Sequence, residues 1–233
     1  SLVNYGNLSC GVWCAGEGSA LVNYGTVESD GGIWINNADE SDTPWSLLNF
    51  GDIKFITYNA VWCDVLNFGS MVFDATPEGA EQNLLGFDSY NFVNCGAIDI
   101  GEGSYFYVGG EMLNRGSITV AGHLDIFGRL INREGAIAVP SGGLLYNYGV
   151  LDMYDAGTLD IAEGGDFNTT EGVFLHRDYG TVNGAVNGTE WYVDFTPIDG
   201  EVPQVHATTE AELLAAMSDE GVEAVIIENE LSL

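Results

Sequence analysis

The sequence predicts an all-β fold: a parallel β-helix solenoid of about eight coils, followed by a short C-terminal helix-strand unit. Two observations predict it. An Asn-x-Gly motif recurs about every 20 residues, and apolar and polar residues alternate after each copy. The composition agrees, because 32 glycines and only five prolines suit many tight turns between short strands. Parallel crossovers are nearly always right-handed, so we expect a right-handed coil.

The repeat is carried by eight asparagines, each preceded by two apolar residues. They are spaced 19, 26, 18, 27, 20, 18 and 15 residues apart, and the two long intervals place loop insertions around 29–46 and 74–91. Glycine follows two residues after each asparagine, one place late at Gly135. The members of this predicted Asn ladder are Asn4, Asn23, Asn49, Asn67, Asn94, Asn114, Asn132 and Asn147.

Each position after the asparagine has its own chemistry. The position four residues on, or five at Asn132, is always apolar: Leu8, Val27, Ile53, Met71, Ile98, Ile118, Ile137 and Leu151. Two residues after this apolar position lies a second column, which runs from Cys10 to Met153 and is apolar except at Ser29. The residues between the two columns are partly polar and partly apolar. This alternation predicts a half-buried strand in every coil, stacked in register on its equivalents.

A second set of strands is predicted at 105–108, 124–127 and 158–161. Coils about 4.8 Å apart would build a rod on the order of 40 Å long. We expect the asparagines to adopt left-handed turn geometry and to hydrogen-bond one another along the rod. We expect the glycines to supply positive φ where the chain turns. Both columns are predicted to be structural.

The C-terminal part has a different pattern. We expect the solenoid domain to span residues 1–196, a linker residues 197–204, and a helix-strand unit residues 205–233. Thr209 to Glu212 forms a capping box ahead of an apolar stripe, Gly221 is placed to end that helix, and residues 224–227 read as a strand.

The charge and the cysteine content narrow the function. Five Lys and Arg against 35 Asp and Glu give a net charge of −30, which disfavours nucleic acid and anionic membranes as partners. No apolar run is long enough for membrane insertion. Four cysteines with one close pair do not make a disulfide scaffold. We identify no catalytic residues and no metal ligands, and a peripheral Ca²⁺ is the one cofactor left open.

The position directly after each asparagine carries the candidate binding residues Tyr5, Tyr24, Phe50 and Phe68. It continues as Cys95, Arg115, Arg133 and Tyr148. Because buried and exposed positions alternate along a strand, we expect the side chains of this column to face outward. The column therefore predicts an exposed aromatic edge that could stack on sugars or bind a protein. Trp34 and Trp45 fall in the first insertion and are further candidates. The alternative is that the rings only stabilise a corner of the solenoid.

The Asn-x-Gly coils, over roughly residues 1–170, resemble the parallel β-helices of bacterial surface proteins and pectin-lyase-like proteins. The helix-strand unit is similar to a cap or start of such a helix. The resemblance implies a secreted or cell-surface, adhesin-like module of a larger parent chain, with a glycan or a surface protein as partner. It also implies the alternative of a carbohydrate-active lyase or hydrolase, although the carboxylate-plus-base cluster of such enzymes is not found in the columns.

Overall fold

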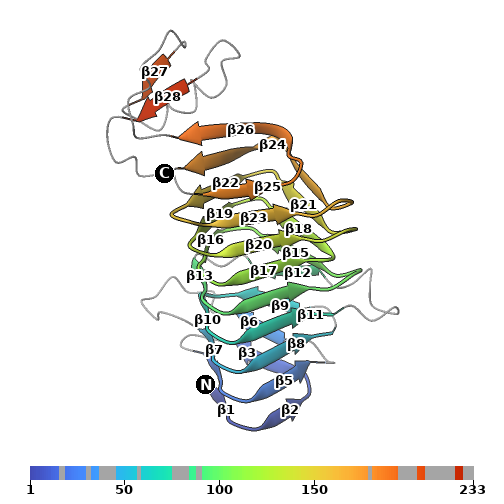
Figure 1. Ribbon diagram of the computed structural model, residues 1–233. Coiled ribbons are helices and arrows are strands. Elements are labelled where there is room, and N and C mark those ends of the chain that lie inside the picture. The colour runs from blue at the N-terminus through green and yellow to red at the C-terminus, as the bar shows by residue number, and fades with distance from the viewer. Residues whose placement is uncertain are drawn as a thin grey trace.

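The computed structural model is a parallel β-solenoid of about seven turns, close to the eight coils expected (Figure 1). It describes residues 1–15, 19–29, 33–36, 46–56, 59–74, 84–87, 91–177, 180–193, 204–207 and 224–227. Each regular coil contributes three short strands, which we assign to stacks a, b and c in chain order. The strands alternate buried and exposed residues, as a half-buried strand does.

Stack a is formed by β1 (Leu2–Asn4), β4 (Leu21–Asn23), β7 (Leu47–Asn49), β10 (Val65–Asn67), β13 (Asn91–Asn94), β16 (Glu111–Asn114), β19 (Arg129–Arg133) and β22 (Val150–Tyr154). Stack b is formed by β2 (Asn7–Ser9), β5 (Thr26–Ser29), β8 (Asp52–Phe55), β11 (Ser70–Phe73), β14 (Ala97–Ile100), β17 (Ser117–Val120), β20 (Ala136–Val139), β23 (Thr158–Ile161) and β25 (Thr181–Asn183). Within each stack, neighbouring strands pair in parallel.

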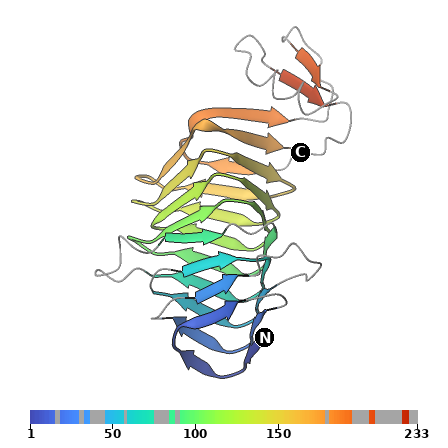
Figure 2. The same cartoon turned by 180° about the vertical axis from the view of Figure 1, so that it is seen from behind.

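Stack c is formed by β3 (Val12–Ala15), β6 (Ile33–Asn36), β9 (Asn59–Trp62), β12 (Leu84–Phe87), β15 (Tyr105–Val108), β18 (His123–Ile126) and β21 (Leu144–Asn147). The long strands β24 (Asp166–Arg177) and β26 (Asn187–Val193) run from stack c into stack a and join the two into one 17-stranded sheet. The view from behind shows the same parallel stacking on the opposite side (Figure 2).

The asparagine ladder is real and runs from Asn4 to Asn132. Each Nδ2 from Asn4 to Asn114 donates to the Oδ1 of the asparagine one coil further on, over 2.7 to 2.9 Å. Each of these amides also donates to a backbone carbonyl of the next coil. The asparagines from Asn23 onward are buried within the apolar interior, so these bonds satisfy groups that would otherwise be costly to bury.

Asn147 does not belong to this ladder, and our prediction was wrong there. β21 pairs with β18, so Asn147 lies in register with Ile126, whereas Asn132 lies in register with Met153 of β22. The last member of the predicted apolar column was wrong for the same reason, because Ile137 pairs with Leu159 rather than with Leu151. Asn147 instead donates to the Thr169 hydroxyl over 2.9 Å, in a separate column of stack c.

The glycines and asparagines of the repeat do not have the backbone geometry we expected. Neither the repeat glycines nor the ladder asparagines adopt positive φ in the described chain. The glycine is required for a different reason, namely the close approach of the neighbouring coil. A Cβ built on Gly69 would lie 2.0 Å from the carbonyl oxygen of Gly51, and one on Gly96 would lie 2.0 Å from that of Gly69.

The intervals interpreted as loop insertions also contain regular strands. β6 lies within 29–46 and pairs with β3 and β9, and β12 lies within 74–91 and pairs with β9 and β15. At the C-terminal end, β27 (Gln204–Ala207) and β28 (Ala224–Ile227) form a two-stranded parallel sheet, so the strand expected at 224–227 is confirmed. The helix expected before it lies outside the described residues.

Candidate functional site

The predicted aromatic edge is a continuous ring stack along one corner of the solenoid. Tyr5, Tyr24, Phe50 and Phe68 stack with successive centroid distances of 5.0, 5.0 and 5.4 Å and interplanar angles below 10°. The rings are exposed as expected, but the faces of Tyr24 and Phe50 are covered on both sides by their neighbours. Mainly ring edges remain accessible there, which suits stabilisation of the corner better than stacking on a sugar.

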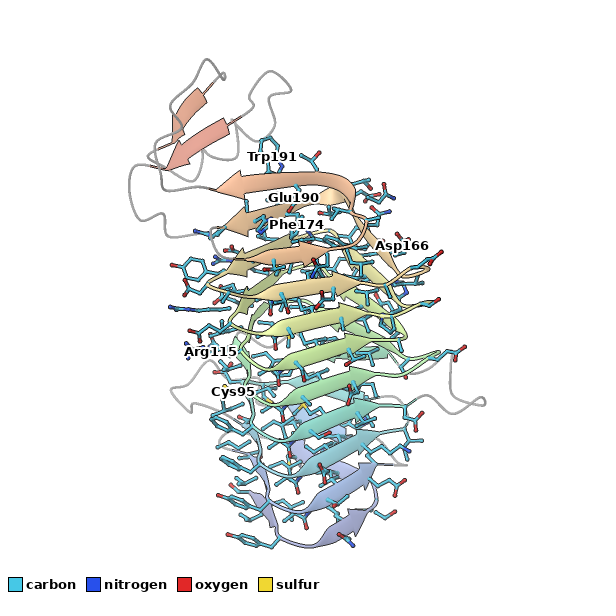
Figure 3. The ribbon with its side chains drawn as sticks, viewed as in Figure 1. Cys95, Arg115, Asp166, Phe174, Glu190 and Trp191 are labelled. Atoms are coloured by element: carbon cyan, nitrogen blue, oxygen red, sulfur yellow. The ribbon has the colours of Figure 1, made fainter. Side chains whose placement is uncertain are left out.

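The same column loses its aromatic character further along the rod. Figure 3 shows Cys95 and Arg115 one above the other on this edge. The Arg115 guanidinium forms a 3.2 Å ion pair with Glu134, and the Arg133 guanidinium forms a 2.8 Å ion pair with Asp155. These arginines are therefore engaged with acidic side chains of the next coil.

Trp34 is placed differently from what we expected. It lies in β6, where it is in register with Trp13 of β3, and the two rings stack at 5.7 Å. The two tryptophans thus share a column that the sequence reading missed, and Trp34 is half-buried rather than displayed on a loop. Trp45 lies outside the described residues.

A second aromatic surface covers the outer face of stack c, where sequence reasoning placed no site. We call it the c-face cluster; its members are Tyr105, Tyr107, His123, Asp125, Phe127, Tyr146 and Tyr148. The His123 ring contacts Tyr105 and Tyr146 edge to face, at 5.0 Å in both cases. A sequence signal was present, because Tyr105/Tyr107, His123/Asp125 and Tyr146/Tyr148 alternate with period two.

Asp125 is the polar centre of this cluster. Its side chain is only 8% exposed, and its Oδ1 lies 2.8 Å from His123 Nε2. The Tyr105 hydroxyl donates to the other carboxylate oxygen. Burial raises the pKa of the Tyr105 phenol well above its ordinary value, and the hydrogen bond to Asp125 raises it further. Tyr105 therefore remains a protonated donor at neutral pH.

A shallow cavity of about 90 Å³ adjoins the cluster. It is lined by Tyr146, Asn147, Tyr148, Asn168, Thr170 and Glu171. Tyr148 stacks on Phe127 at 5.2 Å, so one face of its ring is covered from below. Tyr146 lies in register with Asn168 and Val150 with Val173, so residues 169–172 pass above the segment that holds Tyr148, and none of them is aromatic. The cavity lies where the aromatic stack ends.

The polar lining of the cavity retains unused hydrogen-bonding capacity. Asn147 is 1% exposed, and its buried Oδ1 has no hydrogen-bond partner. The Asn168 Oδ1 accepts from the Thr170 backbone N–H at 3.0 Å and from the Thr170 hydroxyl at 2.8 Å, which directs the Asn168 amide donors elsewhere. A buried amide oxygen without a donor is unusual in a folded protein.

Comparison of the chain with family models, with curated proteins and with solved structures found no match in any of the three.

The basic side chains of the chain all have acidic partners. The ion pairs are Lys54–Asp74 at 2.7 Å, Arg115–Glu134 at 3.2 Å, Arg129–Asp152 at 2.9 Å, Arg133–Asp155 at 2.8 Å and Arg177–Asp152 at 2.7 Å. Asp152 is buried, so the two arginines that share it compensate its charge. None of these cations lines the cavity beside Tyr148.

The described part of the chain shows neither a metal-binding cluster nor a membrane-spanning helix. It contains no group of three or more His, Cys, Asp or Glu side chains that could hold a metal ion. None of its segments is a helix long and apolar enough to cross a membrane. The four cysteines are free thiols; Cys10 is exposed, whereas Cys63 is buried and burial raises the pKa of its thiol.

Proposed function

We propose that this chain is a non-catalytic, extracellular β-solenoid module that binds neutral glycans in the cavity beside Tyr148. The observation that carries the proposal is the interrupted ring stack. Phe127 and Tyr148 stack on successive coils, and the next coil continues the stack with no third ring, because residues 169–172 are not aromatic and Thr170 lines the cavity instead. The ring of a sugar fits this place because its C–H face packs on an aromatic face as another ring would.

The polar lining supports a hydroxyl-rich ligand. The Asn168 amide donates a hydrogen bond, and the exposed Glu171 carboxylate accepts one at the rim. A few oriented polar groups beside an aromatic platform are typical of small-ligand sites. A neutral sugar is favoured over a uronate, because the net charge is −30 and no Lys or Arg lines the cavity.

The test is binding of the purified chain to an array of neutral and uronate-containing oligosaccharides, followed by titration calorimetry of the best neutral ligand. Tyr148→Ala removes the platform, and Thr170→Phe fills the cavity by completing the stack. We expect each variant to bind at least about tenfold more weakly, which corresponds to about 1.4 kcal/mol. The thermal unfolding of both variants is measured to show that they fold.

Tyr24→Ala is the matched control, because it removes a ring of the exposed corner stack and leaves the cavity intact. We expect it to bind as the original chain does. If Tyr24→Ala abolishes binding and Tyr148→Ala does not, the corner stack is the recognition surface and the cavity is not. The absence of binding to every neutral oligosaccharide would also refute the proposal.

A further inference from the structure

The outer face of stack a carries a continuous column of aliphatic side chains. It runs in register through six successive coils, and its members are Val22, Leu48, Leu66, Val93, Leu113 and Ile131. Each member lies between two buried residues of its strand and is itself half-buried, so it points away from the interior. Two residues further along the chain, the exposed rings of Tyr24, Phe50 and Phe68 widen this apolar surface. We call these nine residues the a-face strip.

The solenoid itself does not require an apolar outer face. Stack b provides the comparison within the same coils, because its strands alternate buried and outward residues in the same way. Its outward column is Glu28, Lys54, Val72, Asp99, Thr119 and Ala138. Only Val72 and Ala138 of that column are apolar. Strands that are apolar on both sides are typical of sheets covered on both faces, so the a-face strip has the composition of a covered surface.

Charge limits what can cover the strip. The chain has a net charge of −30, yet none of the nine residues of the strip is charged. Charged side chains beside its upper end have partners. Glu111 lies 3.6 Å from Arg129, and Glu134 lies 3.2 Å from Arg115. Two copies of so acidic a chain repel each other over most of their surface, but they can approach through this neutral face at a low electrostatic cost.

We propose that the a-face strip binds a second copy of this chain, sheet against sheet, about a two-fold axis. The periodicity of the strip favours this occupant. Its side chains recur once per coil, about 4.8 Å apart, and a second strip has the same spacing, so the two sets of side chains interdigitate along their whole length. Contact through the same patch on both copies gives a closed dimer. The cavity beside Tyr148 is not part of the strip, so the dimer is independent of glycan binding.

The size of the strip predicts a weak dimer. Six coils about 4.8 Å apart and two columns about 7 Å apart give a strip of roughly 30 by 15 Å, so two strips bury on the order of 900 Å² in total. This area lies at the low end of specific interfaces. We therefore expect a dissociation constant in the micromolar range.

The test is sedimentation velocity of the purified chain at concentrations from about 1 µM to about 1 mM. We expect a dimer that forms as the concentration rises and does not grow further. Leu66→Lys places a cation at the centre of the strip, and we expect it to weaken dimerisation at least about tenfold. Because this change lowers the net negative charge, general repulsion does not account for such a loss.

Val72→Lys is the matched control, since it makes the same change of charge on the outer face of stack b in the same coil. We expect it to dimerise as the original chain does. Thermal unfolding of both variants shows that they fold. A dimer that persists in Leu66→Lys would overturn the proposal, as would a dimer that Val72→Lys weakens equally.

Two thiols of the chain report which face is covered. Cys95 is half-buried on the corner column, one coil above Phe68, whereas Cys10 is exposed between β2 and β3. We expect Cys95 to react more slowly with a thiol reagent as the dimer forms, and Cys10 to react at an unchanged rate. A chain that stays monomeric at the highest concentration would refute the proposal. Growth beyond the dimer would also refute it, because it requires contact with a different surface of the next copy.

Discussion

At the scale of single residues, the interior of the solenoid admits polar groups only where they are bonded, with few exceptions. The ladder asparagines are satisfied by each other and by backbone carbonyls. Ser104 is buried and donates its hydroxyl to Phe73 O at 2.9 Å. Ser29 is fully buried, in register with Phe55, and its hydroxyl has no partner. The Ser29 hydroxyl is therefore a polar group buried without compensation in an otherwise apolar column, which is energetically unfavourable.

Ser29→Ala should stabilise the fold, because it removes a hydroxyl that is desolvated without compensation. We expect the free energy of unfolding to rise by about 1 kcal/mol, measured by urea denaturation. Ser104→Ala is the matched control, and it should lower the free energy of unfolding by about 1 kcal/mol since it breaks a made bond. A loss of stability in Ser29→Ala comparable to that in Ser104→Ala would show that the Ser29 hydroxyl is bonded.

Tyr105→Phe should destabilise the chain in a pH-dependent way. The folded-state pKa of Tyr105 is raised by burial and by its bond to Asp125, so its contribution is fully present below the ordinary phenol pKa near 10. We expect a loss of about 1.5 kcal/mol at pH 7. The difference between the two chains should shrink as pH rises above 10. Urea denaturation at several pH values measures it, and a difference that grows above pH 10 would contradict the assignment.

At the scale of the strands, adjacent coils are matched position by position, and each column has its own rule. The asparagine column demands a side chain that donates and accepts at once. The glycine column demands the absence of a side chain, because carbonyl oxygens of the neighbouring coil approach to about 2 Å of the Cβ position. The column at the aromatic corner accepts several residue types. It changes from aromatic residues to arginines along the solenoid, and the strands beside it remain paired.

Asn67→Ala should be severely destabilising, because it removes one of the two acceptors of Asn49 Nδ2 and the amide that donates to Asn94. We expect the free energy of unfolding to fall by about 3 kcal/mol or more, given the cost of unsatisfied buried groups. Asn4→Ala provides the comparison, since Asn4 is only half-buried at the end of the ladder. Similar losses in the two variants, measured by thermal unfolding, would refute a role specific to the buried ladder.

The error at Asn147 also belongs to this scale. The interval of 15 residues after Asn132 is shorter than any other interval in the repeat, so a full coil does not fit between them. Asn147 therefore lies in β21 of stack c, one strand before the stack a strand that would continue the ladder, and it faces Thr169. Tyr148 moves with it, away from Arg133 and onto Phe127, and this shift creates the cavity.

At the scale of the whole molecule, the charge is strongly unbalanced. The sequence carries thirty more acidic than basic side chains, and all five Lys and Arg already form ion pairs. Such a surface repels itself and repels polyanions. The same surface disfavours acidic glycans at the cavity.

Raising NaCl from 10 mM to 0.3 M should stabilise the fold, because screening weakens the general repulsion more than it weakens five ion pairs. We expect the unfolding temperature to rise by on the order of a few degrees, measured by calorimetry. CaCl₂ at matched ionic strength is the control, and an additional rise would indicate that carboxylates bind Ca²⁺. A fall in the unfolding temperature with NaCl would show that the ion pairs dominate.

The sequence by itself determined the parallel solenoid, the strand after each asparagine, the apolar interior and the ladder up to Asn132. These follow from local periodicity and from repetition at one position per coil, which a single chain displays in full. Only the tertiary structure decided the register beyond Asn132, the reason for the glycines, the c-face cluster and the cavity beside Tyr148. Each of these depends on which residues of neighbouring coils lie against one another, and that is a property of the stacked coils rather than of any one repeat.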